Sequence, residues 1–199
     1  IYVRETFDLK TGKPDYTPIE KEAYKFSELV NQISPLNVQP SPYTDAFLHF
    51  SLSISNTNKG TKLLKNSFSW IGEPYFAFSD VVGISYQPNV TEVKNTRAFV
   101  FNYINTTTKK PLTKPVSLYR ATQNGLAAVF DLPKYAKDRT GYLQLEVEKT
   151  YTDTLKTNTY AHYNHSILQF SPNPSFSVDG GSMISSTFGI QEERYTTRA

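Results

Sequence analysis

Two glutamates, Glu146 and Glu148, stand two residues apart in the segment YLQLEVEKTY. Alternate side chains of a strand point to the same face, so both carboxylates are expected on the face opposite Leu143, Leu145 and Val147. Glycosidases place two carboxyl groups across a sugar, about 5 to 10 Å apart. The pair is therefore compatible with a hydrolase, although alternating glutamates are also ordinary on the solvent face of a strand.

Tyr142 and Gln144 fall on the same side of this strand as the two glutamates. A flat aromatic ring beside amide and carboxylate groups suits sugar rings and their hydroxyls. The pattern predicts a shallow glycan-binding surface made of Tyr142, Gln144, Glu146 and Glu148. A hydrolase would instead need a deep cleft in which several carboxylates converge. The carboxylates available for such a cleft are Glu146, Glu148, Asp80 and Glu73.

The three histidines do not form a recognisable site in the sequence. His162 and His165 stand three residues apart in HYNH, and the flanking residues indicate an extended chain. Residues three apart in a strand point to opposite faces, so this pair does not predict a metal site. His49 is expected on the polar face of its strand, with no partner nearby in sequence. No zinc-ligand set, nucleophile elbow, Walker loop or dinucleotide fingerprint is present, so we predict no catalytic residue, metal or cofactor.

Asp80 interrupts the aromatic segment SWIGEPYFAFSDVVGISY, residues 69–86. Alternation places Phe68 and Trp70 on one face of their strand, and Phe78, Val82 and Ile84 on one face of the next strand, which predicts a core rather than an exposed ligand platform. Asp80 falls on that face. It marks either a bulge or turn, or a buried carboxylate that must find hydrogen-bond donors, because an unpaired buried charge is costly. We therefore predict Asp80 as a possible buried polar site.

The composition and spacing predict a mainly β protein. With 14 Tyr and 13 Phe in 199 residues, the chain is rich in residues that suit a pleated, half-buried surface. No break in composition divides it, which favours one domain over residues 1–199. Strands are expected at 1–8, 46–55, 62–71, 75–86, 96–104, 116–121, 126–131, 141–151, 158–170 and 182–190. Many short strands indicate a single antiparallel β-sandwich, immunoglobulin-like or jelly-roll-like.

One helix is expected near the N-terminus, at about residues 18–33, in TPIEKEAYKFSELVNQISP. Thr17 can cap it, Pro18 suits the first helical position, and Glu20 completes a capping box. Apolar residues then recur at helical spacing, namely Ile19, Ala23, Phe26, Val30 and Ile33.

The segment DLPKYAKDRTGYLQLEV, residues 131–147, resembles the Asp, Gly and Tyr corner that leads into a late strand of immunoglobulin-like sandwiches. In this resemblance Tyr142 is the corner tyrosine. The spacing departs from the family pattern because Gly141 directly precedes Tyr142 and no cysteine follows. The resemblance implies a sandwich fold and no function.

The net charge is +3, and the lysines occur in small groups such as Lys109, Lys110 and Lys114 in turn-like segments. These groups indicate solvated loops, with at most weak attraction to an anionic cell wall or membrane surface. Nucleic-acid binding would need a denser stripe of Lys and Arg, so no nucleic-acid partner is predicted. No segment is apolar enough to span a membrane.

The chain contains no cysteine and begins at Ile1. We expect an exported protein of a Gram-positive bacterium, from which a signal peptide has been removed, although the choice of expressed fragment would also explain the missing Met. The favoured function is a non-catalytic extracellular or cell-surface protein that binds a glycan or another protein. The alternatives are a carbohydrate-active hydrolase with paired carboxylates, and a structural subunit that assembles through strand edges. The ligand and the oligomeric state stay open.

Overall fold

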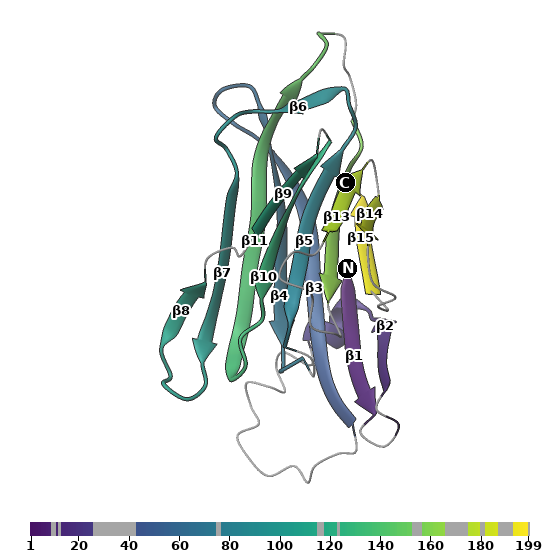
Figure 1. Ribbon diagram of the computed structural model, residues 1–199, viewed down its shortest axis with the longest axis vertical. Helices are drawn as coiled ribbons and strands as arrows, with labels where there is room; N and C mark the ends of the chain where they lie inside the picture. The colour runs from purple at the N-terminus through teal and green to yellow at the C-terminus, as the bar shows by residue number, and fades with distance from the viewer. Residues whose placement is uncertain are drawn as a thin grey trace.

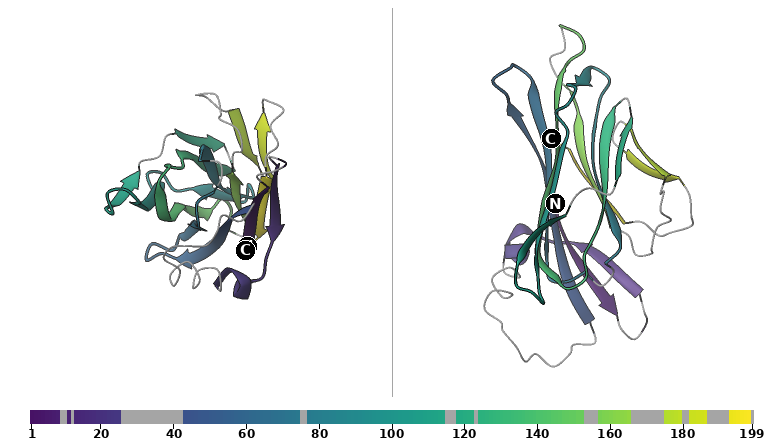
Figure 2. Two further views of the ribbon diagram at one scale, coloured as in Figure 1. Left: turned by 90° about the horizontal axis from the view of Figure 1, so that it is seen from below. Right: turned by 60° about the vertical axis from the view of Figure 1, so that its left-hand side comes forward.

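The computed structural model is a sandwich of two antiparallel sheets that face each other along the long axis of the molecule (Figures 1 and 2). The structure describes residues 1–8, 11, 13–25, 43–74, 77–114, 118–122, 124–152, 157–165, 175–179, 182–186 and 193–198. The predicted antiparallel β-sandwich is confirmed.

The larger sheet has eight strands and the smaller sheet has five. Across the larger sheet the order is β2 (Lys13–Pro18), β1 (Tyr2–Asp8), β3 (Tyr43–Asn56), β4 (Lys62–Ile71), β11 (Ala136–Lys149), β7 (Ala98–Asn105) and β8 (Pro111–Lys114), and β6 (Val90–Glu92) pairs with the end of β11. Across the smaller sheet it is β15 (Glu193–Arg198), β12 (Thr159–His165), β5 (Ser79–Tyr86), β10 (Gly125–Asp131) and β9 (Leu118–Thr122). A separate hairpin of β13 (Ser175–Asp179) and β14 (Ser182–Ser186) contacts β5, β9 and β10 through β13.

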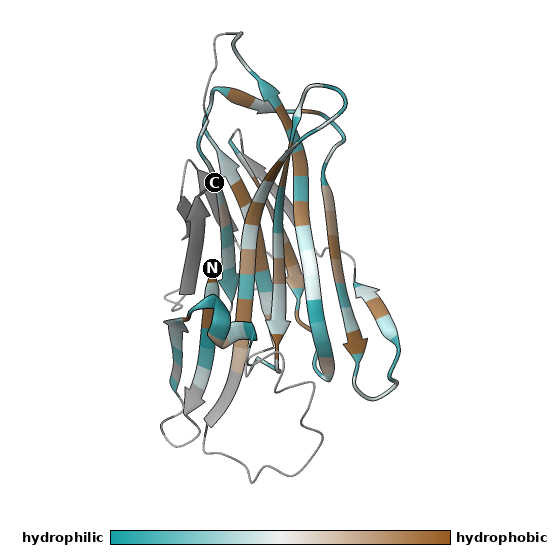
Figure 3. Cartoon of the chain, turned by 180° about the vertical axis from the view of Figure 1, so that it is seen from behind, coloured by the Kyte–Doolittle hydropathy of each residue, from teal (hydrophilic) through white to brown (hydrophobic). Residues whose placement is uncertain are grey.

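The core lies between the sheets and is built by strict alternation. Along β4, every second side chain from Leu64 to Trp70 is buried, and β11 buries alternate residues in the same way. Aromatic rings fill the centre: the ring centroid of Phe68 lies 5.1 Å from that of Phe130 and 5.2 Å from that of Tyr163. The predicted core role of Phe68 and Trp70 is confirmed, because each is only 3% exposed. Figure 3 shows the alternation as bands along the strands.

Several strand boundaries differ from those predicted. The strands at 62–71 and 126–131 match β4 and β10 closely, whereas β5 begins at Ser79 and β11 already at Ala136. Five strands were not expected at all: β2, β6, β8, β13 and β15. β6 and β8 are only three and four residues long, and β2, β8 and β15 lie at sheet edges, so they carry little of the apolar alternation that identifies a strand.

The predicted start of the helix is wrong. Thr17 and Pro18 belong to β2, where they pair with Arg4 and Val3 of β1. Proline is tolerated there because β2 is an edge strand and its end needs no further N–H donor. The helical residues in the described part are 21–25, and the rest of the predicted helix, residues 26–33, lies outside the described residues. No described helix is long and apolar enough to cross a membrane.

This short helical segment packs on the outer face of the larger sheet (Figure 3). The hydroxyl of Tyr24 forms a 2.8 Å hydrogen bond with the hydroxyl of Ser69 on β4. The ring of Tyr2 stacks on His49 of β3 at 4.3 Å, and Tyr24 lies 5.0 Å from Tyr2. The helical segment therefore closes one end of that outer face.

Candidate functional site

The four predicted binding residues all lie on the outer face of β11. Tyr142, Gln144 and Glu146 are partly exposed, and Glu148 is exposed. The residues between them, Leu143, Leu145 and Val147, point into the core. Alternation thus places the four side chains in one line, but their binding role remains a prediction.

The neighbouring strands extend this line into a flat polar surface. In the strand pairing, Tyr142 stands beside Ser67 of β4, and Ser67 stands beside Ser51 of β3. One row further along the strands, Gln144, Lys65 and Ser53 are aligned in the same way. We call these six residues the serine face: Ser51, Ser53, Lys65, Ser67, Tyr142 and Gln144. Because serine side chains are short, Tyr142 and Lys65 are the largest groups on it.

Tyr142 does not form the corner that its sequence context suggested. β11 runs without interruption through this position, and Tyr142 lies in the middle of the strand with Val100 on its other side. The ammonium of Lys65 lies 4.0 Å from the ring centroid of Tyr142, a cation–π contact that orients both side chains. The ring is therefore held in place on the surface of the sheet, and it does not anchor a loop as a corner tyrosine would.

The serine face is bounded at both ends. At one end Tyr24 covers Ser69, as described above. At the other, the hydroxyl of Thr61 donates a 2.7 Å hydrogen bond to Oε2 of Glu146. From strand geometry, the open area between them is about 20 Å long and about 14 Å across four strands. Such an area accommodates an extended polymer lying along the strands.

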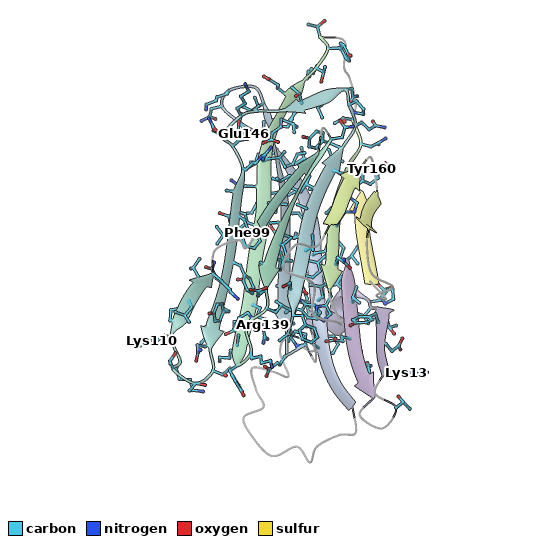
Figure 4. The ribbon with its side chains drawn as sticks, viewed as in Figure 1. Lys13, Phe99, Lys110, Arg139, Glu146 and Tyr160 are labelled. Atoms are coloured by element: carbon cyan, nitrogen blue, oxygen red, sulfur yellow. The ribbon has the colours of Figure 1, made fainter. Side chains whose placement is uncertain are left out.

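The carboxylates proposed for hydrolysis do not converge. Glu73 follows β4 at the end of the molecule where Trp70 pairs with Arg139, whereas Glu146 pairs with Leu63 at the opposite end. Figure 4 shows Glu146 and Arg139 far apart along the long axis. Asp80 is fully buried between the sheets. Glu73, Glu146 and Asp80 therefore cannot act together on one sugar, whereas Glu146 and Glu148 stay neighbours on the outer face of β11.

A shallow pocket of about 650 Å³ lies at the turn between β6 and β7. It is lined by Glu92, Lys94, Asn95 and Arg97. Arg97 forms a two-pronged ion pair with Glu92, through its Nε and its Nη2 at 2.8 Å, so the acid is already neutralised by its neighbour. None of the predicted site residues lines this pocket.

Asp80 lies inside β5, with its carboxylate between the two sheets and no exposed surface. It is therefore a buried carboxylate rather than a bulge or turn. The hydroxyl of Tyr163 donates a 2.7 Å hydrogen bond to Oδ2 of Asp80. Nδ1 of His165 lies 2.9 Å from Oδ1 and 3.1 Å from Oδ2. Tyr163 and His165 come from β12, which pairs with β5, so alternation brings all three to one face.

The larger sheet completes this buried cluster. Nε1 of Trp70 donates a 2.9 Å hydrogen bond to the hydroxyl of Tyr163. On the far side of His165, Nε2 lies 3.4 Å from Oε1 of Glu5. The same oxygen of Glu5 accepts a 3.1 Å hydrogen bond from the hydroxyl of Tyr16. The cluster thus joins β1, β2 and β4 of one sheet to β5 and β12 of the other.

The two histidines of HYNH lie on opposite faces of β12, as their spacing predicts. Burial by itself lowers the pKa of His165, but the charge of Asp80, aided by Glu5 and by hydrogen bonds, outweighs it and raises the pKa to about 10. His162 forms a 2.7 Å hydrogen bond with the hydroxyl of Ser85, and burial lowers its pKa to about 4. At neutral pH His165 is therefore charged and His162 is neutral. No group of three His, Asp or Glu side chains among the described residues could hold a metal ion.

These pKa shifts predict a stability maximum near pH 6.5. Between pH 4 and 6.5, His162 takes up a proton only when unfolded, so the free energy of unfolding rises with pH, by up to about 3 kcal/mol. Between pH 6.5 and 10, His165 keeps its proton only when folded, so stability falls as pH rises. Urea unfolding at a series of pH values measures both limbs.

Single variants separate the two limbs. His162→Gln should flatten the acid limb, leaving the smaller share of His49, whose pKa is also lowered by burial and by the N-terminal and Lys21 charges. His165→Gln should flatten the alkaline limb only. A wild-type profile that is level from pH 6.5 to 9 would contradict a charged His165.

The cluster contains residues that the sequence did not identify as functional or paired. Alternation places Tyr163 and His165 on the same face of their strand, and a search for donors to Asp80 among aromatic and histidine residues on core faces would have found them. Glu5 carries no such signal, because His165 lies 160 residues away from it in the sequence, and Tyr16 joins the cluster only through Glu5.

No protein-family model matches the sequence, and no curated protein matches it. Among solved structures, the chain is similar to the collagen-binding subdomain of the Enterococcus faecalis surface protein ACE, with 9% identity, 75% of this chain and 94% of that chain covered, and a TM-score of 0.38. A collagen-binding domain from a Staphylococcus aureus adhesin is 10% identical, with 74% of this chain and 95% of that chain covered, and a TM-score of 0.36. Modules of a Clostridium thermocellum xylanase in complex with xylohexaose are 10% identical, with 54% of this chain and 26% of that chain covered, and a TM-score of 0.26. At TM-scores below 0.5, these likenesses carry no argument about what the chain binds.

Proposed function

We propose that the chain is a non-catalytic, exported binding module that holds an extended glycan along the serine face. The observation that supports this most directly is the row Ser51, Ser67 and Tyr142, in which the serine hydroxyls of β3 and β4 lie to one side of a fixed aromatic ring on β11. Hydroxyls and the amide of Gln144 suit sugar hydroxyls, and the ring suits a sugar face. The absence of cysteine is compatible with export and display on a Gram-positive cell surface.

The carboxylates argue for binding without hydrolysis. Glu146 accepts a hydrogen bond from Thr61, and Glu73 and Asp80 lie elsewhere in the molecule. Assembly through strand edges is less favoured for the larger sheet. Its edge strands β2 and β8 are six and four residues long and carry Pro and Lys, which are typical of edges protected against further pairing.

The test is a glycan array probed with wild-type protein and with Tyr142→Ala. We expect binding to an extended neutral glycan that weakens about tenfold in the variant, the equivalent of one aromatic contact. The matched control is Tyr151→Ala, which removes a 63% exposed tyrosine far from the serine face and should leave binding unchanged.

A third variant, Lys65→Met, tests how the ring is used. Because Lys65 lies over the ring, a neutral sugar that stacks there must displace it, so this variant should bind at least as well as wild type. A loss in Lys65→Met equal to that in Tyr142→Ala would point to an anionic ligand instead. Binding to triple-helical collagen but to no glycan would replace the glycan with a protein ligand, and no binding to either would reject the serine face as a site.

A further inference from the structure

A second surface stands at the end of the sandwich opposite Glu146. It consists of the turn 106–110, between β7 and β8, and the loop 132–138, between β10 and the irregular start of β11. We call these residues the basic tip. The N–H of Thr106 donates a 2.7 Å hydrogen bond to the carbonyl of Tyr135, which joins the two segments. Figure 4 shows Lys110 of this tip toward the same end as Arg139.

Tyr135 projects from this tip in a strained conformation. Tyr135 is 66% exposed, which makes it one of the most exposed large aromatic residues among those described. Its φ is 55°, in the left-handed region, which costs a residue other than glycine about 1 to 2 kcal/mol. The conformation persists because both backbone groups are held: the N–H donates to Oε1 of Glu73 at 3.2 Å, and the carbonyl accepts from Thr106. An exposed aromatic ring held under strain is typical of a functional site.

A buried arginine supports the loop from beneath. The side chain of Arg139 has no exposed surface. Its Nη1 donates to the carbonyl of Gly72 at 3.0 Å, and its Nη2 donates to the carbonyl of Pro133 at 3.3 Å and lies 3.7 Å from Glu73. Arg139 thereby ties the loop that carries Tyr135 to the end of β4. The ring stands on a fixed base, so binding to it needs little ordering of the loop.

The basic tip carries four lysines and one carboxylate, which gives it a net charge of +3, equal to that of the whole chain. The positive and negative charges of the rest of the chain therefore cancel. Lys137 lies 4.0 Å from Asp138, and both are well exposed, so this ion pair is weak. Among the described residues, the ammonium groups of Lys109, Lys110 and Lys134 have no ion-pair partner.

We propose that the basic tip binds an acidic glycan, with Tyr135 against a sugar ring and the lysines against sulfate or carboxylate groups. The charge selects a polyanion, and the ring adds a contact that charge alone does not supply. Thr107 and Thr108 are exposed beside the lysines and offer hydroxyls to sugars. A membrane surface fits less well, because the tip exposes one aromatic ring rather than a set of apolar side chains. This site is separate from the serine face and stands without it.

The binding experiment compares dextran sulfate, polygalacturonate and neutral dextran by isothermal titration calorimetry at two salt concentrations. Wild-type protein should bind one or both polyanions, more weakly at high salt and more tightly than it binds neutral dextran. The two polyanions distinguish sulfate from carboxylate. Equal binding to neutral dextran, or no binding to either polyanion, would overturn the proposal.

Two sets of variants locate the site. Tyr135→Gly removes the ring and keeps the fold, because glycine adopts a positive φ freely, and it should bind about tenfold more weakly. Gln in place of Lys109, Lys110 and Lys134 should also weaken binding about tenfold. The control replaces Lys59, Lys94 and Lys149, three exposed lysines elsewhere, with Gln, and changes the net charge equally.

Each remaining outcome decides against the proposal in a different way. An equal loss in the control triple variant would show that net charge, not the tip, governs binding. Full binding by Tyr135→Gly would remove the ring from the site. Tighter binding to vesicles of equal phosphatidylglycerol and phosphatidylcholine, or to oligothymidine, would replace the glycan with a membrane or a nucleic acid.

Tyr142→Ala should leave polyanion binding unchanged, which keeps this test independent of the serine face.

Discussion

Asp80→Ala is expected to destabilise the protein by about 3 to 5 kcal/mol, because it leaves the His165 ring and the Tyr163 hydroxyl buried without the carboxylate that they share. Tyr163 donates to Asp80, and His165 lies within 2.9 Å of it, with all three fully or nearly fully buried. Urea unfolding followed by the fluorescence of Trp70, the single tryptophan, measures the loss at a site in contact with the cluster.

The matched control is Asp131→Ala. Asp131 is exposed on β10, accepts a 2.5 Å hydrogen bond from Ser79 and lies 3.5 Å from Lys114. An exposed pair of this kind contributes about 1 kcal/mol or less, so this variant should remain close to wild type. Asp80→Asn adds a second measurement, because it keeps the shape but removes the charge that raises the pKa of His165. The alkaline loss of stability should then be smaller and end at a lower pH, because the pKa of folded His165 moves back toward its unfolded value. If Asp80→Ala and Asp131→Ala lose equal stability, the cluster does not hold the sheets together.

The fold could largely be predicted from alternation. Phe68, Trp70, Val82 and Ile84 lie in the core where their parity placed them, because a one-residue slip would expose the whole apolar side of a strand. The helix at 18–33 shows where local signals fail. Thr17, Pro18 and Glu20 satisfy the rules for a helix start, yet pairing of Thr17 and Pro18 with β1 extends β2 through these positions. The pairing of β2 with β1 outweighed the local helix propensity there, and the local residue pattern around Thr17 gives no sign of this pairing.

The candidate sites divide in the same way. The line from Tyr142 to Glu148 lies within one strand, so its shared face could be read directly from the sequence. The serines beside it come from β3 and β4, and only the strand register brings them into the same row. Asp80 could be identified because it breaks a pattern, whereas Arg139 lies within the register shift between Lys137 and Thr140, before the apolar alternation of β11 begins. Tyr135 depends on a backbone angle that the segment LPKYAKD does not indicate.

Gly141→Ala should destabilise the protein by about 3 kcal/mol or more, or prevent folding, because no space exists for a methyl group. A Cβ at this position would lie 2.5 Å from Cζ of Phe68 and 2.6 Å from the carbonyl oxygen of Val100. The Phe68 ring is packed against Phe130, and the carbonyl belongs to β7, which pairs with β11 here. Chemical unfolding, or the yield of folded protein, measures the effect.

Two comparisons separate a steric cause from a conformational one. Gly60→Ala meets no atom within 4 Å but must hold a φ of +79°, so it should lose only about 1 to 2 kcal/mol. Adding Phe68→Leu to Gly141→Ala removes one clash and leaves the other, since the carbonyl of Val100 cannot move without displacing β7. The double variant should therefore be less destabilised than the sum of the two single changes, but still well below wild type. A Gly141→Ala protein within 1 kcal/mol of wild type would show that β7 can move away from β11, and that the register supporting the serine face is adjustable.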